Sequence, residues 1–529
     1  MIRKIFFLCS LLLVAVSPLK AQDDPKAAGA AIDTIVRVFS ETEIVDRFVA
    51  DIYKKFEKDT KKGPILAARI AKAYYNYVMV PGNPTPQYHR RDVPKALEYL
   101  NKAIALDPKY AQSYLVASDL FFNEAKIDTA LIWLDKGIAE NPTDSSLYIE
   151  SAKLLAFSDP DAAVQKLMVL KERDSTFQVD LQLGRLYYRL YDKHGKLPMA
   201  EMATAYGRVF DSADRSKMTL YDMSYYCMGL QFANDLGSER FVKLYDVTNY
   251  GMEIFPKDFA MKHFHLLGCL NTEKWDDGLK TMDVMKAMPD SVKKFQTDDY
   301  LWYASCLAGA KHYKEAISQF EYVLSMDDVE ENRRNQAQVA INNTIGKQVD
   351  ELVDMGDYEQ AVAIIEPAVQ KTRDNGNQND NLVNKFGRLY LTWASELNGT
   401  EKQDAIKKAV KVYAEGAEHS NLNASMFLYQ CIQNSEAFDS ETDYKNSYGL
   451  PYASKMIALL ATKNDIDNAE RARLVRAYQY MMRYEYFNGF VFQKKKKSKG
   501  VALEYAYNVL ELDPTDALAQ RFISVLGGK

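Results

Sequence analysis

The feature that most constrains the fold of this 529-residue chain is an internal repeat about 34 residues long. Four positions recur at offsets 0, 4, 7 and 12, and the two clearest copies lie 34 residues apart: Ala96, Leu100, Ala103, Pro108 and Ala130, Leu134, Gly137, Pro142. Residues at the first three offsets share one face of an α-helix, and a Pro or Asp five positions later ends that helix. Each copy therefore predicts one helix with a buried apolar stripe.

The repeat continues along nearly the whole chain with spacings of 33 to 49 residues. Its copies begin at Ala96, Ala130, Ala163, Met202, Leu244, Gly278, Ala316, Ala361, Ala409, Ala453 and Ala502. This spacing accommodates a pair of helices with loops of variable length. Because one pair cannot bury its apolar stripe alone, neighbouring pairs must stack. We therefore predict an all-α chain of stacked helix pairs.

The sequence also predicts a first helix upstream of several stripes. It contains a glycine at one register, as in Leu183, Gly184 and Tyr187, and again in Phe386, Gly387 and Tyr390. A glycine inside a helix costs about 1 kcal/mol relative to alanine. Its recurrence predicts a close helix crossing that a larger side chain would block. Only 24 glycines and 16 prolines occur in the chain, which also favours a helical fold over a turn-rich one.

These stripes, glycines and terminators resemble the tetratricopeptide repeat (TPR) family over roughly residues 64–526. The resemblance implies a right-handed α-solenoid, a superhelix of about eleven antiparallel helix pairs whose first helices line a concave groove. We place the repeats at residues 64–514. A segment at 22–63 is expected to supply an N-terminal capping helix from Glu43 to Lys61, and 515–529 a C-terminal capping helix and tail.

The first 21 residues have the order of a secretory signal peptide. Arg3 and Lys4 precede twelve mostly apolar residues, and Ala21 is the expected cleavage point. A lipid anchor is not expected, because Cys9 lies inside the apolar region and Gln22 would begin the mature chain. No later segment is apolar for long enough to span a bilayer. We therefore expect an exported protein, most simply a bacterial periplasmic one.

The charge balance argues against nucleic acid as a partner. The formal net charge is −5, and the leader carries three cations and no acid, so the mature chain would be more acidic still. Phosphate binding needs a basic surface. The one exception is a run of five lysines, for which a solvated loop between two helices is our first interpretation and contact with anionic lipid or an acidic partner the alternative: Lys494, Lys495, Lys496, Lys497 and Lys499.

The residues give no positive sign of catalysis, of a cofactor or of a metal site. Phosphate-binding glycine loops and nucleophile turns are missing from the sequence. His265 and Cys269 are four residues apart and so share a helical face, but no carboxylate cluster completes a site, and a structural role is favoured. Four cysteines remain after the leader and are interpreted as small buried residues: Cys227, Cys269, Cys306 and Cys431.

The leading hypothesis is a non-enzymatic scaffold that binds a protein or peptide in its groove and assists assembly of a cell-envelope complex. Its groove residues are expected on first helices at Arg69, Lys72, Tyr75, Asn76, Arg185, Tyr188 and Arg189. Reversing the charge of Arg185 and Arg189 is expected to weaken capture of an acidic partner without lowering stability. The alternative is a carbohydrate-binding protein serving nutrient uptake, compatible with the 35 tyrosines. Oligomeric state and partner identity are not encoded in these patterns.

Overall fold

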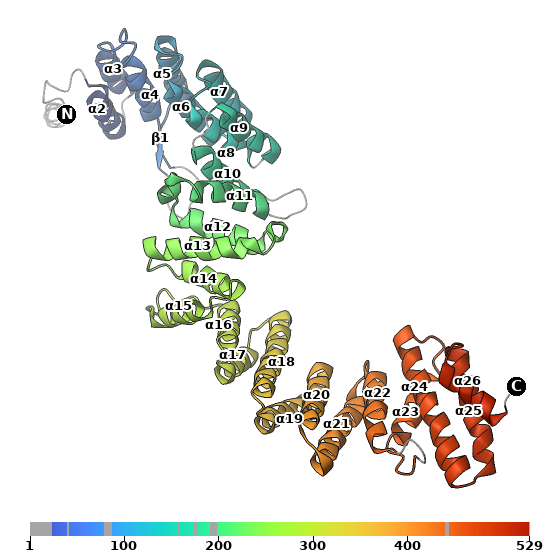
Figure 1. The fold of residues 1–529 in the computed structure, drawn as a ribbon. Coiled ribbons are helices and arrows are strands. Elements are labelled where there is room, and N and C mark those ends of the chain that lie inside the picture. Colours follow the sequence, from blue (N-terminus) through green and yellow to red (C-terminus); the bar gives the residue numbers. More distant parts are fainter. Residues whose placement is uncertain are drawn as a thin grey trace. The chain divides into compact units, whose positions relative to one another are not determined.

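The computed structural model describes residues 24–39, 42–78, 87–156, 158–173, 177–190, 198–439 and 444–527. The predicted signal peptide lies outside the described residues. The chain divides into two compact units, Met1–Thr272 and Glu273–Lys529. Both are built almost wholly from α-helices, and consecutive helices within each unit lie side by side (Figure 1). The predicted all-α class is confirmed. The handedness of the superhelix and the number of its pairs stay predictions.

The first unit holds thirteen α-helices, two short 3₁₀ turns and one two-stranded hairpin among its described residues. Their bounds are α2 Pro25–Val38, α3 Thr42–Tyr53, α4 Gly63–Tyr74, β1 Tyr75–Val78, β2 Gln87–Arg91, α5 Val93–Leu106, α6 Ala111–Asn123, α7 Ile127–Glu140, α8 Ser145–Leu155, α9 Pro160–Arg173, α10 Phe177–Arg189, α11 Met199–Phe210, η2 Ala213–Lys217, α12 Leu220–Phe232, η3 Asn234–Leu236, α13 Glu239–Ile254 and α14 Phe259–Asn271.

The second unit continues the same alternation of helices. Its bounds are α15 Trp275–Ala287, α16 Thr297–Gly309, α17 Tyr313–Ser325, α18 Glu331–Asp354, α19 Tyr358–Asp374, α20 Asp380–Glu396, α21 Gly399–His419, α22 Ala424–Ser435, η4 Glu436–Phe438, α23 Leu450–Leu460, α24 Asn468–Tyr484, the π-helix η5 Glu485–Phe492, α25 Lys496–Leu512 and α26 Ala517–Leu526.

Each predicted stripe lies in a helix of its own, from α5 and α7 through to α25. The stripe residues are buried, and Ala96, Leu100 and Leu134 are 0% exposed. The same holds in the second unit, where Phe320 is 1% exposed and Ala502 is 0% exposed. Successive helices pack on each other, and within the first unit α4, α6, α8, α10, α12 and α14 also pack each on the next. The core thus follows the stripes along each unit as a series of neighbouring clusters.

The turns between paired helices repeat as closely as the stripes do. A residue with positive φ stands two positions before the second helix at Ala125, Lys311 and Gly356, with φ of 57°, 66° and 76°. This left-handed residue closes the turn after the first helix, and a glycine adopts it at least cost. Gly356 and Asp357 form such a turn between α18 and α19.

The recurrent glycines of the first helices lie at close crossings, as predicted. A Cβ on Gly184 would come within 2.8 Å of the Tyr206 ring in α11. A Cβ on Gly387 would overlap the Tyr413 ring in α21. Both tyrosines are fully buried at 0% exposure, so their rings have no room to move aside. Glycine at this register lets an aromatic ring of the second helix fill the crossing.

The N-terminal segment differs from its expected form. It contains two helices, α2 and α3, and both pack on α4. The helix expected from Glu43 to Lys61 ends at Tyr53, and turns stabilised by Asp59 lead to Gly63. The predicted apolar face is nevertheless buried at Val45, Val49 and Phe56. At the other end, α26 covers α25 and ends at Gly527, whose φ is 71°.

The burial of the apolar stripe of α7 is tested by Leu134→Ala. Because Leu134 is 0% exposed, the variant should lower the free energy of unfolding by about 2–5 kcal/mol, measured by denaturant unfolding followed by circular dichroism. Ile132→Ala in the same helix is the matched control, since Ile132 is 53% exposed and its loss should cost less than about 0.5 kcal/mol. Equal losses in the two variants would contradict the buried stripe.

The close crossing is tested by Gly387→Ala. The added methyl group would displace the Tyr413 ring, so we expect a loss of about 1–3 kcal/mol in unfolding free energy. Gly500→Ala is the control, because Gly500 lies in helix α25 with open space around its Cβ position. Alanine there should stabilise the helix by about 0.5–1 kcal/mol. A stabilised Gly387→Ala variant would show that no close crossing exists.

Candidate functional site

The largest hollow with several predicted site residues lies in the first unit, between α2, α4, β1 and α6. Its volume is about 810 Å³. Four of the seven predicted groove residues line it, namely Arg69, Lys72, Tyr75 and Asn76. The rest of its lining is Lys26, Asp33, Arg37, Ile65, Ala68, Tyr77, Tyr110, Gln112, Val116 and Asp119. Residues distant in sequence thus form one surface, which we call the α2–α6 groove.

Helix α4 supplies one wall of this groove through residues spaced three and four apart. Ala68, Arg69 and Lys72 share a face of that helix. Arg69 donates to Asp33 of α2 from Nε at 3.0 Å and from Nη2 at 2.7 Å. Its third nitrogen donates to the Lys26 carbonyl oxygen at 3.2 Å. Gly29 leaves the space for the Arg69 stem, so α2 and α4 are tied together at the groove.

The groove carries more positive than negative charge. Four cations line it against two carboxylates, a net charge of +2 in a chain whose overall charge is −5. Asp33 is paired with Arg69, and Asp119 accepts a hydrogen bond from Tyr77 at 2.9 Å. Lys26, Arg37 and Lys72 are exposed, and no carboxylate of the described residues forms an ion pair with them. Their charge is available to an anionic ligand.

Tyr75 and Asn76 lie in strand β1, which corrects their expected place on a helix. The chain leaves α4 at Tyr74 and pairs antiparallel with β2, with Tyr75 opposite Arg91 and Asn76 opposite Arg90. Tyr75 is 3% exposed, and its hydroxyl donates to Glu124 at 2.9 Å beside the Tyr88 hydroxyl. Burial, with these hydrogen bonds, raises the pKa of Tyr75. Tyr75 therefore supports the groove wall and offers a ligand little contact surface.

The other three predicted residues do not join this groove. Arg185 donates from Nε and Nη2 to the two carboxylate oxygens of Asp222, each at 2.7 Å. Tyr188 stacks on Tyr225 with ring centroids 3.6 Å apart. The side chain of Arg189 lies outside the described residues. Because Asp222 is 1% exposed and accepts both hydrogen bonds from that guanidinium, the structure predicts that charge reversal at Arg185 lowers stability.

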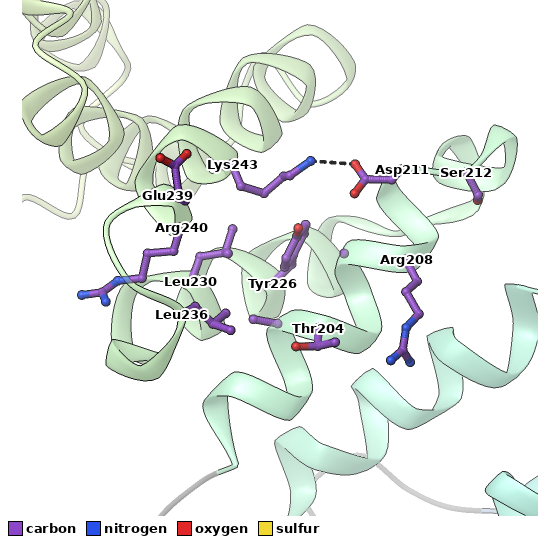
Figure 2. A pocket seen from close by; sticks show the side chains of 12 residues that line it. Thr204, Arg208, Asp211, Ser212, Tyr226, Leu230, Leu236, Glu239, Arg240 and Lys243 are labelled. Carbon is purple, nitrogen blue, oxygen red and sulfur yellow. Dashed lines mark hydrogen bonds and ion pairs between the residues drawn. The ribbon is translucent and has the colours of Figure 1, made fainter.

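A second hollow of about 530 Å³ lies between α11, α12 and α13 (Figure 2). It also carries cations, but each has a partner within the protein. Lys243 donates to Asp211 at 2.7 Å, and Arg208 donates to Asp180 at 3.0 Å. Arg240 donates to the carbonyl oxygens of the turn at residues 233–237. These side chains hold helices and a turn in place, so this hollow is the weaker candidate for a binding site.

His265 and Cys269 form a buried contact in α14. The Cys269 sulfur lies 3.4 Å from His265 Nδ1, and His265 Nε2 lies 3.1 Å from Asn249 Oδ1. The two residues are 2% and 0% exposed. No cluster of three or more His, Cys, Asp or Glu suited to a metal ion occurs within the described part of the chain. The contact of His265 with Asn249 joins α14 to α13.

The four cysteines are buried, as predicted, and none of them forms a disulfide. Burial raises the pKa of the Cys306 thiol to about 12 and raises those of Cys227 and Cys431 as well. These thiols stay protonated at neutral pH, which makes them poor nucleophiles.

None of the described helices is both long and apolar enough to cross a membrane.

Sequence reasoning missed the contribution of α2 to the groove. Lys26, Asp33 and Arg37 precede the capping helix that was expected to begin at Glu43. A signal was present, since Asp24 precedes Pro25 as a helix N-cap, and Ile32, Ile35 and Val36 follow with helical spacing. Asp24 accepts hydrogen bonds from the Lys26 and Ala27 amides in the structure.

Comparison with known proteins gives similarity at the level of solved structures alone. No family model and no curated protein matches the chain. It is similar to the APC/C hetero-tetramer Cut9–Hcn1 at 13% identity, covering 97% of this chain and 92% of that one, with a TM-score of 0.26. It is also similar to Naa15/Naa10 bound to HypK-THB at 14% identity, covering 94% and 65%, with a TM-score of 0.26.

A third similar structure is the P58(IPK) TPR domain at 14% identity, covering 76% of this chain and 94% of that domain, with a TM-score of 0.20. These TM-scores are too low to carry an argument about site or partner. The helix pairs themselves are TPR-like, because the stripe, the turn and the glycine crossing recur at the registers given above.

The Arg185–Asp222 pair is tested by Arg185→Met. Removing the guanidinium leaves a buried carboxylate with Thr219 as its remaining close donor, so we expect a loss of about 1–3 kcal/mol in unfolding free energy. Lys153→Met is the control, since Lys153 and Glu150 form an exposed pair whose loss should cost less than about 1 kcal/mol. An unchanged Arg185→Met variant would mean that the pair contributes nothing.

The same pair predicts a pH dependence. Burial opposes ionisation of Asp222, but hydrogen bonds from Arg185 and Thr219 outweigh it and hold the pKa of Asp222 below its ordinary value. A lowered folded-state pKa adds stability above the ordinary value of about 4, and that stability is lost as the pH falls further. The wild-type chain should lose more stability than Arg185→Met between about pH 4 and pH 2, measured by urea unfolding.

Proposed function

We propose that this protein is a non-enzymatic scaffold that binds an acidic peptide segment of a protein partner in the α2–α6 groove. The observation that carries the proposal is the set of exposed cations without a carboxylate partner in the described structure: Lys26, Arg37 and Lys72. In the second hollow the comparable cations are already paired. Cationic side chains in a concave surface attract an acidic ligand and fix its register.

The groove has the other properties that a peptide site needs. Its tyrosines Tyr77 and Tyr110 provide rigid amphipathic surface, and Gln112 provides a polar group for a peptide backbone. Its volume of about 810 Å³ accommodates several side chains of an extended segment. Its walls are held by the Arg69–Asp33 pair and the β1–β2 hairpin. A wall held in this way loses little entropy on binding.

We further propose that this activity takes place in the periplasm, with a partner from a cell-envelope complex; the signal-peptide-like order of the first 21 residues supports this proposal. The second candidate is carbohydrate binding for nutrient uptake, which the tyrosine-lined groove also favours. The two candidates differ in their dependence on charge. Peptide capture through cations weakens with salt, whereas stacking of neutral sugars on aromatic rings does not.

The proposal is tested by Arg37→Glu with Lys72→Glu. Cross-linking in intact cells, followed by mass spectrometry, should recover a partner with the wild-type chain and lose it with this variant. The melting temperature should fall only slightly, because neither side chain forms an ion pair in the described structure and a cation in the last turn of a helix contributes at most about 1 kcal/mol. Lys54→Glu with Lys58→Glu is the control, with the same charge change at exposed positions outside the groove.

Partner recovery that is equal in the two variants would contradict a role for the groove cations. Micromolar binding of oligosaccharides to the purified chain, with no protein recovered, would favour the second candidate over the first. Binding of an acidic peptide to the purified wild-type chain should fall by at least tenfold in the groove variant, since two reversed charges remove at least about 1.4 kcal/mol.

A further inference from the structure

A second surface, in the second unit, combines clustered positive charge with exposed apolar side chains. It comprises Val491, Phe492 and the lysines at 494–497 and 499, and we call it the Lys/Phe surface. Val491 is 48% exposed and Phe492 is 53% exposed. All five lysines are exposed, and none forms an ion pair with a carboxylate of the described residues. No acidic residue occurs from Tyr486 to Leu503.

The Lys/Phe surface is not the simple solvated loop that the sequence favoured. Lys496, Lys497 and Lys499 belong to the start of α25, and Phe492 ends the π-helix η5. Some helices of this chain begin with an acidic cap, such as Asp467 before α24 and Asp516 before α26, and others begin with a lysine cap, as α4, α7 and α15 do. The N-cap residue of α25 is Lys495, whose side chain forms no capping hydrogen bond. The first turn of α25 contains no acidic residue. Cations at a helix start oppose the helix dipole and repel one another.

The backbone beneath the Lys/Phe surface is held in place. The Lys495 amide donates to the Gly489 carbonyl oxygen at 2.8 Å, and Asn488 Nδ2 donates to the Tyr444 carbonyl oxygen at 3.1 Å. Phe487 stacks on Tyr444, with centroids 6.0 Å apart. Lys494 has a φ of 53° and stands two positions before α25, like the residues that close the turns before α7, α17 and α19. The fold therefore presents these lysines from an ordered turn and helix start.

We propose that the Lys/Phe surface binds the anionic face of a phospholipid membrane. Lysines attract anionic headgroups, and an exposed aromatic or aliphatic side chain beside them inserts at the headgroup–acyl boundary. A nucleic acid would use the lysines but give no reason for Val491 and Phe492 to be exposed next to them, and the test below distinguishes an acidic protein from a lipid surface. The combination of charge and apolar exposure therefore favours a lipid surface. The site is separate from the α2–α6 groove and does not depend on it.

The test is flotation of the purified full chain with vesicles of phosphatidylcholine containing 30% phosphatidylglycerol, a composition chosen as about one anionic lipid in three. The chain should float with these vesicles and stay unbound with phosphatidylcholine alone. The variant K494E/K496E/K497E should bind at least about 100-fold more weakly, since each lysine near an anionic surface contributes about fivefold. Its melting temperature should not fall, because glutamates suit a helix start.

Two further variants make the test specific. K54E/K55E/K58E changes the same charge at exposed positions of the first unit and should bind vesicles like the wild type. Phe492→Ser should weaken vesicle binding about tenfold with the lysines intact. Absence of wild-type binding, an equal loss in both triple variants, or no effect of Phe492→Ser would each overturn the proposal. Binding to polyglutamate but not to vesicles would assign the surface to an acidic protein.

Discussion

The structure depends on one recurring interaction, the burial of the apolar stripe of each second helix against its sequence neighbours. The stripe residues are small or aliphatic in most copies and are close to fully buried. Because a single helix pair leaves half of this surface exposed, each pair is stabilised by the next one along the chain. The fold has few contacts between distant parts of the sequence, and its stability is a sum of local interfaces. Because packing uses the stripe faces of the helices, side chains on the outer surfaces and groove walls are available for binding.

The repeat made the helices and their buried faces predictable. Offsets of 0, 4 and 7 specify a helical face regardless of what lies beyond it, so the stripes at Ala96, Ala316 and Ala502 were correctly assigned. The glycines at 184 and 387 were predictable for the same reason, since their cost in a helix requires a compensating contact. The buried stripes and the glycine crossings involve only one helix and its neighbour in the chain, so the spacing of residues in the sequence predicts them.

The site was predictable only in part, because its geometry comes from contacts that the repeat does not encode. Arg69 and Lys72 lie in the groove as expected, but α2 and the β1–β2 hairpin build its remaining walls. The hairpin had a weak signal, since the aromatic Tyr75 and Tyr77 precede a segment rich in Pro and Gly. The pairing of Arg185 was not predicted, because its partner, Asp222, is 37 residues away. The repeat positions do not indicate which charged residues pair across long distances in the sequence.

The central claim, that each helix is held by its neighbours in the sequence, is tested most directly by hydrogen–deuterium exchange with mass spectrometry on Phe320→Ala. Phe320 is 1% exposed and belongs to the stripe of α17. The account predicts faster exchange in α16 to α19, with protection kept in α21 to α26 and throughout the first unit. A uniform loss of protection across both units would contradict it, because that result requires a single cooperative core.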